Sequence, residues 1–170
     1  RAFSHFSSFG CPEPCTFCCS PLVTNRRWKA IPGKQLAEEI AELQQRFKFD
    51  VLRFQDANWG VAEKRTKEFC QTLVDLKVPI YWNGTIEIET IMRYKEETLD
   101  LLEESKCHLL WLGAETGTKE MQVRIKKEIG IDNIPIAIGK LAERNIVPGT
   151  FWIIGYPGES RDSMIETLKQ

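Results

Sequence analysis

The sequence predicts an α/β fold, a partial (β/α) parallel barrel with about five strand–helix units. Apolar runs of strand length alternate with segments of helical periodicity, far enough apart for a helix to cross back over a sheet. Glycine or polar residues follow each expected strand, as they do where parallel strands end. The chain is 42% hydrophobic and 28% charged, which excludes a disordered protein.

The elements follow in order along the chain. The expected strands are the apolar or aromatic runs 2–9, 51–55, 78–83, 107–113 and 148–155. The expected helices are 34–47, 62–76, 98–105, 119–125, 134–143 and a last helix from residue 160, where Ser160 is suited to be the N-cap. The fourth and fifth strands are apolar on both faces, which fits strands between helices and a barrel interior. Five units are too few to close an eight-unit barrel.

The net charge, the lengths of the apolar runs and the two ends of the chain limit the classes of protein to consider. The net charge is −1, which argues against nucleic acid as a partner. No apolar run approaches the roughly 18 residues of a membrane span, and no secretory signal is visible. A cytoplasmic protein is expected because the clustered cysteines suit a reducing compartment. The chain begins at Arg1 and ends at Gln170 inside an expected helix. We therefore expect residues 1–170 to be one incomplete core domain of a longer protein.

The cysteines are distributed unevenly. Four of the six, Cys11, Cys15, Cys18 and Cys19, lie within nine residues, and adjacent Cys18 and Cys19 are poor disulfide partners for each other. This spacing favours a metal or cluster site in a reducing compartment over a disulfide framework. The other two, Cys70 and Cys107, lie in apolar patterns and are expected in the core.

Cys11, Cys15 and Cys18 carry the strongest chemical signal. Three thiolates from one loop can bind one face of a soft-metal centre and leave one iron of a four-iron cluster without a protein ligand. An open position of this kind is typical of a catalytic centre. The alternative is a structural zinc ion with His5 or Cys19 as the fourth ligand, although the second paired element usual in zinc sites is missing.

Residues 10–21, GCPEPCTFCCSP, contain the pattern CxxxCxΦC with Phe17 as the aromatic residue. This motif resembles that of the radical SAM enzymes, which use S-adenosylmethionine (SAM). It is most similar to the cobalamin-associated branch, whose members often read GCPxxCxFCxxP. The resemblance continues through 54–59, 113–118 and 153–160, each following an expected strand, and so covers nearly the whole chain.

The resemblance implies cofactors and a reaction. Cys11, Cys15 and Cys18 would hold an oxygen-sensitive [4Fe–4S] cluster, and SAM would chelate the fourth iron. One electron, from a donor of the flavodoxin or ferredoxin type, would cleave SAM to methionine and a 5′-deoxyadenosyl radical, which takes hydrogen from a small-molecule substrate. A cobalamin-dependent methyltransferase is the leading expectation. The alternatives are another branch, such as a methylthiotransferase, or a non-catalytic iron–sulfur or zinc module.

The resemblance also implies contacts with the adenine of SAM. Phe17, between two cluster cysteines, would pack near the ring. Ile154 and Gly155, at the end of the fifth strand, would let apolar surface and backbone approach it. The cobalamin signature D-x-H-x-x-G is absent from the chain, so cobalamin is expected only through a flanking domain.

Three polar residues are expected to bind the rest of SAM. Gln55 and Asp56 occupy the position where relatives contact the methionine amino group, although the Gly-Gly-Glu of some branches is missing. Glu115 would accept hydrogen bonds from the ribose hydroxyls. Without a cofactor, Asp56 could instead form an Asx turn or a helix cap. Glu115 could likewise be a turn residue before an N-cap at Thr118.

The other charged groups are open to plainer interpretations. The basic stretch Arg26-Arg27-Trp28-Lys29 is either a solvated loop or a contact for an anionic substrate, the SAM carboxylate or a neighbouring domain. His108 is expected in the core beneath a helix, and an inward His5 below the cysteines is the less favoured placement. The acidic side chains expected on helix surface are Glu87, Glu89, Glu96 and Glu97.

Overall fold

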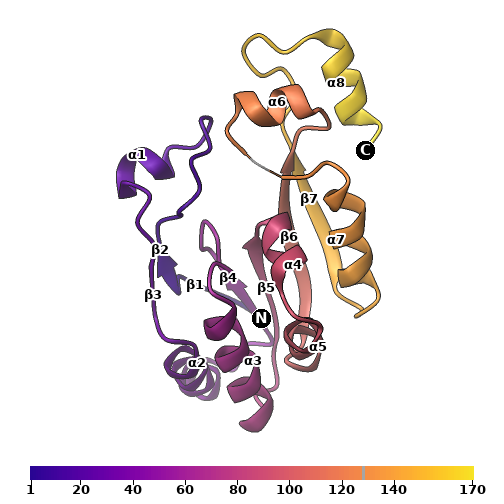
Figure 1. Ribbon diagram of the computed structural model, residues 1–170. Helices are drawn as coiled ribbons and strands as arrows, with labels where there is room; N and C mark the ends of the chain where they lie inside the picture. Colours follow the sequence, from indigo (N-terminus) through magenta and orange to yellow (C-terminus); the bar gives the residue numbers. More distant parts are fainter. Residues whose placement is uncertain (128) are drawn as a thin grey trace.

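The computed structural model describes residues 1–127 and 129–170 and contains a five-stranded parallel sheet (Figure 1). Its strands stand in the order β1-β4-β5-β6-β7, so each strand pairs with the next sheet strand along the chain. Their bounds are Ala2–His5, Val51–Phe54, Tyr81–Ile86, Cys107–Glu115 and Val147–Trp152. This sheet confirms the predicted α/β class with five strand–helix units.

The helices lie in the connections between the strands and after the last strand. Their bounds are α1 Ser20–Thr24, α2 Gly33–Phe47, α3 Glu63–Asp75, α4 Ile88–Arg93, α5 Glu96–Glu104, α6 Lys119–Arg124, α7 Asn133–Ala142 and α8 Arg161–Leu168. Ser160 caps α8 as expected, because its Oγ accepts a hydrogen bond from the Ser163 amide at 3.1 Å. Among the described residues, no helix combines the length and apolarity needed to span a bilayer.

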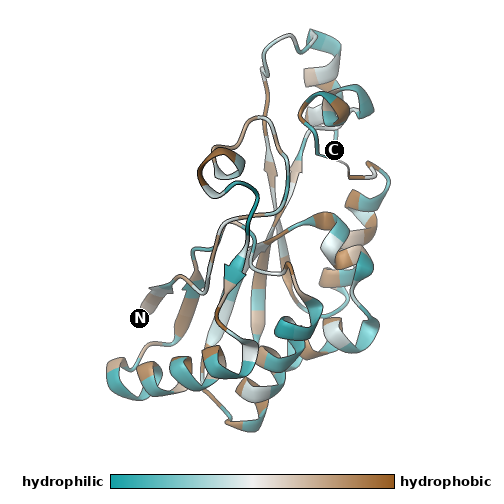
Figure 2. Ribbon diagram, turned by 60° about the vertical axis from the view of Figure 1, so that its left-hand side comes forward, coloured by the Kyte–Doolittle hydropathy of each residue, from teal (hydrophilic) through white to brown (hydrophobic). Residues whose placement is uncertain are grey.

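The main core lies between the sheet and the helices on one of its faces. Along β4, Leu52 and Phe54 are buried whereas Arg53 is exposed, and Figure 2 shows this alternation of hydrophobic and hydrophilic residues along the strands. Trp59 and Trp82 lie at the centre of the core, with ring centroids 4.7 Å apart. The candidate site described below uses residues from the carboxyl ends of these strands.

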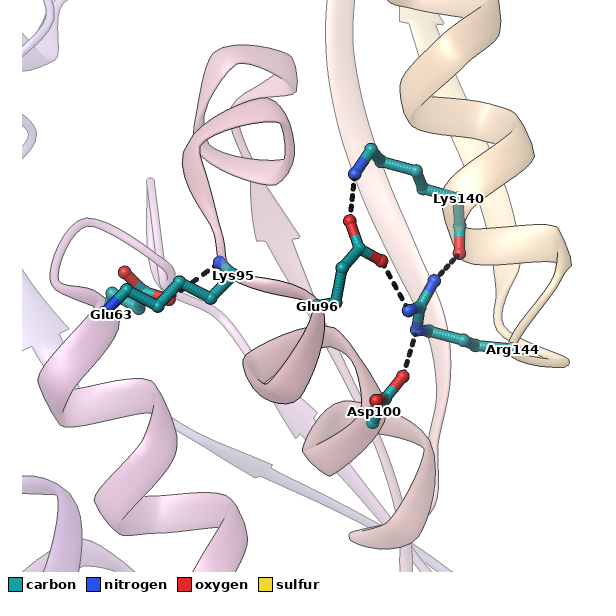
Figure 3. Close-up of polar contacts among 6 residues, drawn as sticks. All are labelled: Glu63, Lys95, Glu96, Asp100, Lys140 and Arg144. Carbon is teal, nitrogen blue, oxygen red and sulfur yellow. Dashed lines mark hydrogen bonds and ion pairs between the residues drawn. The ribbon is translucent and has the colours of Figure 1, made fainter.

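Ion pairs join neighbouring helices at the surface (Figure 3). Arg144, just after α7, donates to Glu96 at 2.6 Å and to Asp100 at 2.8 Å, both on α5. Lys140 also donates to Glu96. Glu96 and Glu97 are exposed on α5, which confirms the interpretation as helix surface for these two residues.

Three of the predicted strands differ clearly from the structure in their limits. The segment expected as strand 2–9 is split, because Ser8–Phe9 (β2) leaves the sheet and pairs antiparallel with Lys29–Ala30 (β3). The third strand begins and ends later than 78–83, since Pro79 cannot donate to the ladder and pairing with β6 continues to Ile86. The last strand ends at Trp152, so it stops short of the predicted limit at residue 155.

Candidate active site

The cysteines lie on a loop that leaves β2 at Gly10 and returns at β3. Figure 1 shows this loop, which includes α1, beyond the carboxyl ends of the sheet strands on the same side as α6. The amide of Thr16 donates to the Ile125 carbonyl at 2.9 Å, which ties the loop to the segment after α6. The loop therefore covers the edge where polar residues follow the parallel strands.

The three predicted ligands line one cavity of about 120 Å³. Cys11 and Cys15 are buried and Cys18 is half-buried, whereas Cys19 is exposed. The strand ends contribute Thr85, Glu87, Gly113, Glu115 and Phe151, and the other lining residues are Glu13, Phe17, Pro21, Ala57 and Lys127. The site therefore joins one loop to the ends of three sheet strands.

The donor chemistry of this cavity fits an iron–sulfur cluster. Within residues 1–127 and 129–170, no three metal-ligating side chains converge closely enough for a single ion. A cluster instead takes each thiolate on a different iron, so its cysteines need only line the same cavity. The Ser20 amide donates to Sγ of Cys18 at 3.4 Å, a contact of the kind that stabilises negative charge on sulfur.

Burial keeps the two inner thiols protonated when no metal is present. It raises the pKa of Cys11 and raises that of Cys15 to about 11. The positive charge of Lys127 opposes the shift at Cys15, and the Glu87 carboxylate adds to it. Binding of a soft metal must therefore displace protons from these thiols, so loading of the site depends on pH.

A largely buried ion triad lines the same cavity as the thiols. Lys127 Nζ lies 2.9 Å from Oε2 of Glu87 and 3.0 Å from Oε1 of Glu115, and the Lys127 side chain is only 6% exposed. Burial by itself lowers the pKa of Lys127, but the two carboxylates outweigh it and the net shift is upward. Lys127 is therefore charged at neutral pH and pairs with two carboxylates of the site.

The backbone at the end of β6 makes room for this triad. Glu115 has a left-handed φ of 64° and follows an irregularity in the pairing of β6 with β7. A Cβ atom at Gly113 would lie 2.3 Å from Lys127 Nζ and 2.6 Å from Glu115 Oε1. A side chain at position 113 would therefore displace the head groups of Lys127 and Glu115 from their present places.

The triad includes two residues whose role the sequence did not reveal. Glu87 was expected on a helix surface, and that interpretation was wrong, because the true end of β5 at Ile86 puts Glu87 at the rim beside the cysteines. Lys127 follows α6 in a segment with no recognisable pattern. The sequence signal that could have found Glu87 is its position directly after a strand, had the strand been placed correctly.

Comparison with known proteins agrees with this geometry. The sequence profile of the Radical SAM superfamily matches residues 6–170. The chain belongs to this superfamily. An uncharacterized methyltransferase of Pyrococcus horikoshii is 24% identical over 163 residues, which are 96% of this chain and 35% of that protein.

Two solved structures share the fold. The radical SAM methyltransferase TsrM from Kitasatospora setae, with tryptophan substrate and a SAM analogue bound, matches with a TM-score of 0.85 at 16% identity. The match covers 99% of this chain and 33% of TsrM. The cobalamin-dependent radical SAM enzyme OxsB matches with a TM-score of 0.80 at 17% identity, over 98% of this chain and 26% of OxsB. The chain thus spans about a third of the length of such proteins.

The residues expected at the adenine of SAM lie on two loops of this radical SAM core. Phe17 lines the thiol cavity, is 37% exposed and meets Tyr156 edge to face at 6.3 Å. Thr16 Oγ1 lies 3.0 Å from the Tyr156 hydroxyl, so the loop after β7 touches the cysteine loop. Ile154 and Gly155 follow β7 in that second loop and are exposed, with a φ of 84° at Gly155.

Gln55 and Asp56 lie outside the set of described residues that line the cavity. Gln55 is exposed and its amide lies 3.5 Å from Ser4 Oγ. Asp56 is buried, and its carboxylate accepts bonds from the Ser7 amide at 3.1 Å, the Ser7 hydroxyl at 2.9 Å and the Ser8 hydroxyl. The structure thus brings Glu115 to the thiols and directs Asp56 into the base of the loop.

The histidines both point away from the thiols. His5 Nε2 lies 3.2 Å from Glu39 of α2, on the helix-covered side of the sheet. His108 Nδ1 lies 3.0 Å from the Trp82 carbonyl, but the residue is half-buried and its ring meets that of exposed Tyr81 at 5.9 Å, so its expected place in the core beneath a helix is not confirmed. His5 therefore does not join Cys11, Cys15 and Cys18 as a fourth ligand in this arrangement.

A second, polar cavity of about 600 Å³ adjoins the first. It shares Glu13, Glu87 and Lys127 with the thiol cavity, and its other lining residues are Pro14, Arg26, Glu89, Arg93, Lys126 and Ile129. Arg26 also donates to the Pro12 carbonyl at 2.9 Å. Of the predicted basic stretch, Arg26 therefore faces the site region.

Proposed function

We propose that this chain is the catalytic core of a radical SAM enzyme in which Cys11, Cys15 and Cys18 hold a [4Fe–4S] cluster. The observation that carries the proposal is the cavity in which these three thiols meet the charged triad Glu87–Lys127–Glu115. A non-catalytic cluster or zinc module needs no buried charges beside its thiols. Such charges suit a zwitterionic ligand with ribose hydroxyls, which SAM is.

The chain's residues have distinct tasks in this proposal. The bound cluster supplies the electron that cleaves SAM. Glu115 accepts hydrogen bonds from the ribose, and Lys127 balances negative charge at the same wall of the cavity. Phe17 and the loop with Ile154 and Gly155 cover the adenine and exclude water from it. Gln55 stays a candidate contact for the methionine end, since its amide is exposed on the open face of the sheet.

The reaction we favour is methyl transfer with cobalamin as the second cofactor. Support comes from the relatives, since TsrM is a methyltransferase, one TsrM structure holds cobalamin with a [4Fe–4S] cluster, and OxsB is a cobalamin-dependent enzyme. Cobalamin would bind through a domain outside residues 1–170. The substrate is a small molecule, the electron donor is of the flavodoxin or ferredoxin type, and the protein acts in the reducing cytoplasm without membrane or nucleic acid.

Electron paramagnetic resonance (EPR) tests the cofactor assignment. The protein is reconstituted anaerobically with iron and sulfide, reduced with dithionite, and measured with and without SAM. We expect a four-iron signal that shifts when SAM is added, because SAM binds the iron that lacks a cysteine. Zinc in place of iron, or a signal indifferent to SAM, would overturn the proposal.

A matched pair of variants tests Glu115. Glu115→Gln keeps the shape but removes the charge, and we expect about tenfold weaker SAM binding with unchanged cluster content, from loss of a hydrogen bond to a charged group. The control Glu97→Gln changes an exposed carboxylate on α5 and should bind SAM like the parent. Equal SAM affinity in both variants would remove Glu115 from the ligand site.

A further inference from the structure

The cysteine loop is closed at a narrow neck. β2 and β3 pair Ser8 with Ala30 and Phe9 with Lys29, and the Ile31 amide donates to the Ser7 carbonyl at 3.0 Å. All four clustered cysteines lie between these two strands, so the neck fixes where the loop leaves and returns. A two-residue pairing is a weak closure by itself, since isolated two-stranded ribbons are marginal in water.

Arg65 of α3 holds both sides of this neck. Its Nη2 donates to Ser7 Oγ at 2.6 Å on the entering strand, and its Nε donates to the Ile31 carbonyl at 2.9 Å on the returning one. A third donor, Nη1, binds the Trp59 carbonyl at 3.0 Å. The guanidinium is buried and lies over the rings of Trp28 and Trp59, at 5.7 and 5.3 Å from their centroids. A planar cation with several donors suits such a junction.

Asp56 completes the arrangement from the end of β4. The Ser7 hydroxyl donates to Asp56 Oδ1 at 2.9 Å while it accepts from Arg65, so Ser7 connects the buried anion to the buried cation. Asp56 also accepts the Ser7 amide and the Ser8 hydroxyl. Its two oxygens are thus engaged by three donors from the neck, and the carboxylate is 4% exposed.

We infer that Asp56, Ser7 and Arg65 form a clamp that positions the cluster-binding loop, and that Asp56 acts on the site through this loop rather than by touching SAM. The inference rests on the proposed function, because it gives the loop a cluster to hold. It assigns Asp56 a positioning task in place of the contact with the methionine amino group expected from the resemblance. A loop held from both ends keeps Cys11 and Cys15 in the cavity before any cofactor arrives.

The test compares Ser7→Ala and Asp56→Asn with the control Tyr94→Phe. Tyr94 donates to the Gly60 carbonyl at 2.6 Å and lies 2.7 Å from Thr66 Oγ1 of α3, so its loss also removes buried hydrogen bonds next to Arg65 but none from the neck. Two readouts are taken without SAM, and the affinity of the reconstituted protein for SAM is measured separately. One is alkylation of Cys11 and Cys15 in the metal-free protein, and the other is iron release to a chelator after reconstitution. Thermal unfolding shows that each variant is folded.

We expect both readouts to be about tenfold faster in Ser7→Ala and Asp56→Asn than in Tyr94→Phe at similar thermal midpoints, the factor that corresponds to loss of one hydrogen bond to a charged group. Rates equal to those of Tyr94→Phe would overturn the clamp. If Asp56→Asn weakened SAM binding but changed neither rate, the clamp would be wrong and Asp56 would be a contact for SAM. Faster alkylation in a protein that takes up no iron would support the clamp on the loop and refute the proposed function separately.

Discussion

Lys127 Nζ donates a hydrogen bond to Oε1 of Glu115 at 3.0 Å in the buried wall of the cysteine cavity, although the two residues belong to different elements. The same ammonium group lies 2.9 Å from Glu87, at the end of the neighbouring strand. One cation thus fixes two strand ends and the segment after α6. The charge of the site is therefore shared among three residues instead of belonging to Glu115 alone.

Lys127→Met should destabilise the protein, because two carboxylates would stay buried without their cation. We expect a loss of about 2 to 4 kcal/mol in the free energy of unfolding, somewhat less than the roughly 3 to 5 kcal/mol found for fully buried pairs, because the Glu87 side chain is 17% exposed. Denaturant unfolding near pH 7 measures it. Adding Glu87→Gln to Lys127→Met removes one of the stranded charges and should restore part of the loss. If Lys127→Met alone were as stable as the parent, the carboxylates of the triad would be solvated rather than buried.

Glu63 should stabilise the protein fully above its unfolded pKa and progressively less as the pH falls toward its folded-state pKa. Its carboxylate accepts the Thr98 hydroxyl at 2.6 Å and the Lys95 amide at 2.9 Å at the start of α5, and these bonds, the hydroxyl first, lower its pKa (Figure 3 shows the Lys95 contact). A lowered pKa means that the contribution is complete above the ordinary value of 4.5 and is lost as the pH falls through the folded-state value.

Glu63→Gln should therefore cost about 0.5 to 1 kcal/mol at pH 7, the usual net contribution of a hydrogen bond in a protein. The difference from the parent should vanish near pH 2, because both proteins then carry a neutral side chain. Urea unfolding at several pH values measures both. A difference that does not change with pH would contradict the assignment of the effect to the carboxylate charge.

Gly10→Ala should disturb the entrance of the cysteine loop. Gly10 has a φ of 89°, and a Cβ atom there would lie 2.0 Å from the Arg27 carbonyl oxygen. Backbone on the opposite strand of the neck cannot yield as a side chain can, so we expect a loss of about 1 to 3 kcal/mol and a lower iron content after reconstitution.

Gly139→Ala is the matched control for that change. Gly139 lies inside α7, and a Cβ atom there meets nothing within 4 Å among the described atoms. Alanine should stabilise the helix by about 0.5 to 1 kcal/mol and leave the iron content unchanged. Thermal unfolding and iron analysis of Gly10→Ala and Gly139→Ala measure these effects. If the two variants had the same stability and iron content, a Cβ atom at Gly10 would not clash as the structure indicates.

Cys19→Ser should leave cluster content unchanged, whereas Cys18→Ser should abolish stable loading. Cys18 lines the cavity and its Sγ accepts the Ser20 amide, but Cys19 is exposed at the start of α1. Iron and sulfide analysis after anaerobic reconstitution measures this. Loss of iron in Cys19→Ser would place that thiol among the ligands and favour a different set of cysteines.

The strand–helix alternation was predictable because each parallel strand is buried by its own helix and leaves a local apolar pattern. The limits of β5 were not, since its last residues depend on pairing with β6 rather than on their own hydrophobicity. Because of that error, Glu87 was predicted on a helix surface, although it lies directly after β5 beside the cysteines. In the same way, the split of the first strand depends on β3, which lies beyond the loop.

Local pattern and spacing are enough to predict the class of fold, the three thiols on one loop and the resemblance to the radical SAM enzymes. Which charges meet the thiols depends instead on contacts between distant parts of the chain. Lys127 reaches Glu87 and Glu115, and Asp56 reaches Ser7, across connections that no local pattern records. Both contacts form between buried groups, and a charge removed from water is stable only where the fold supplies its partner.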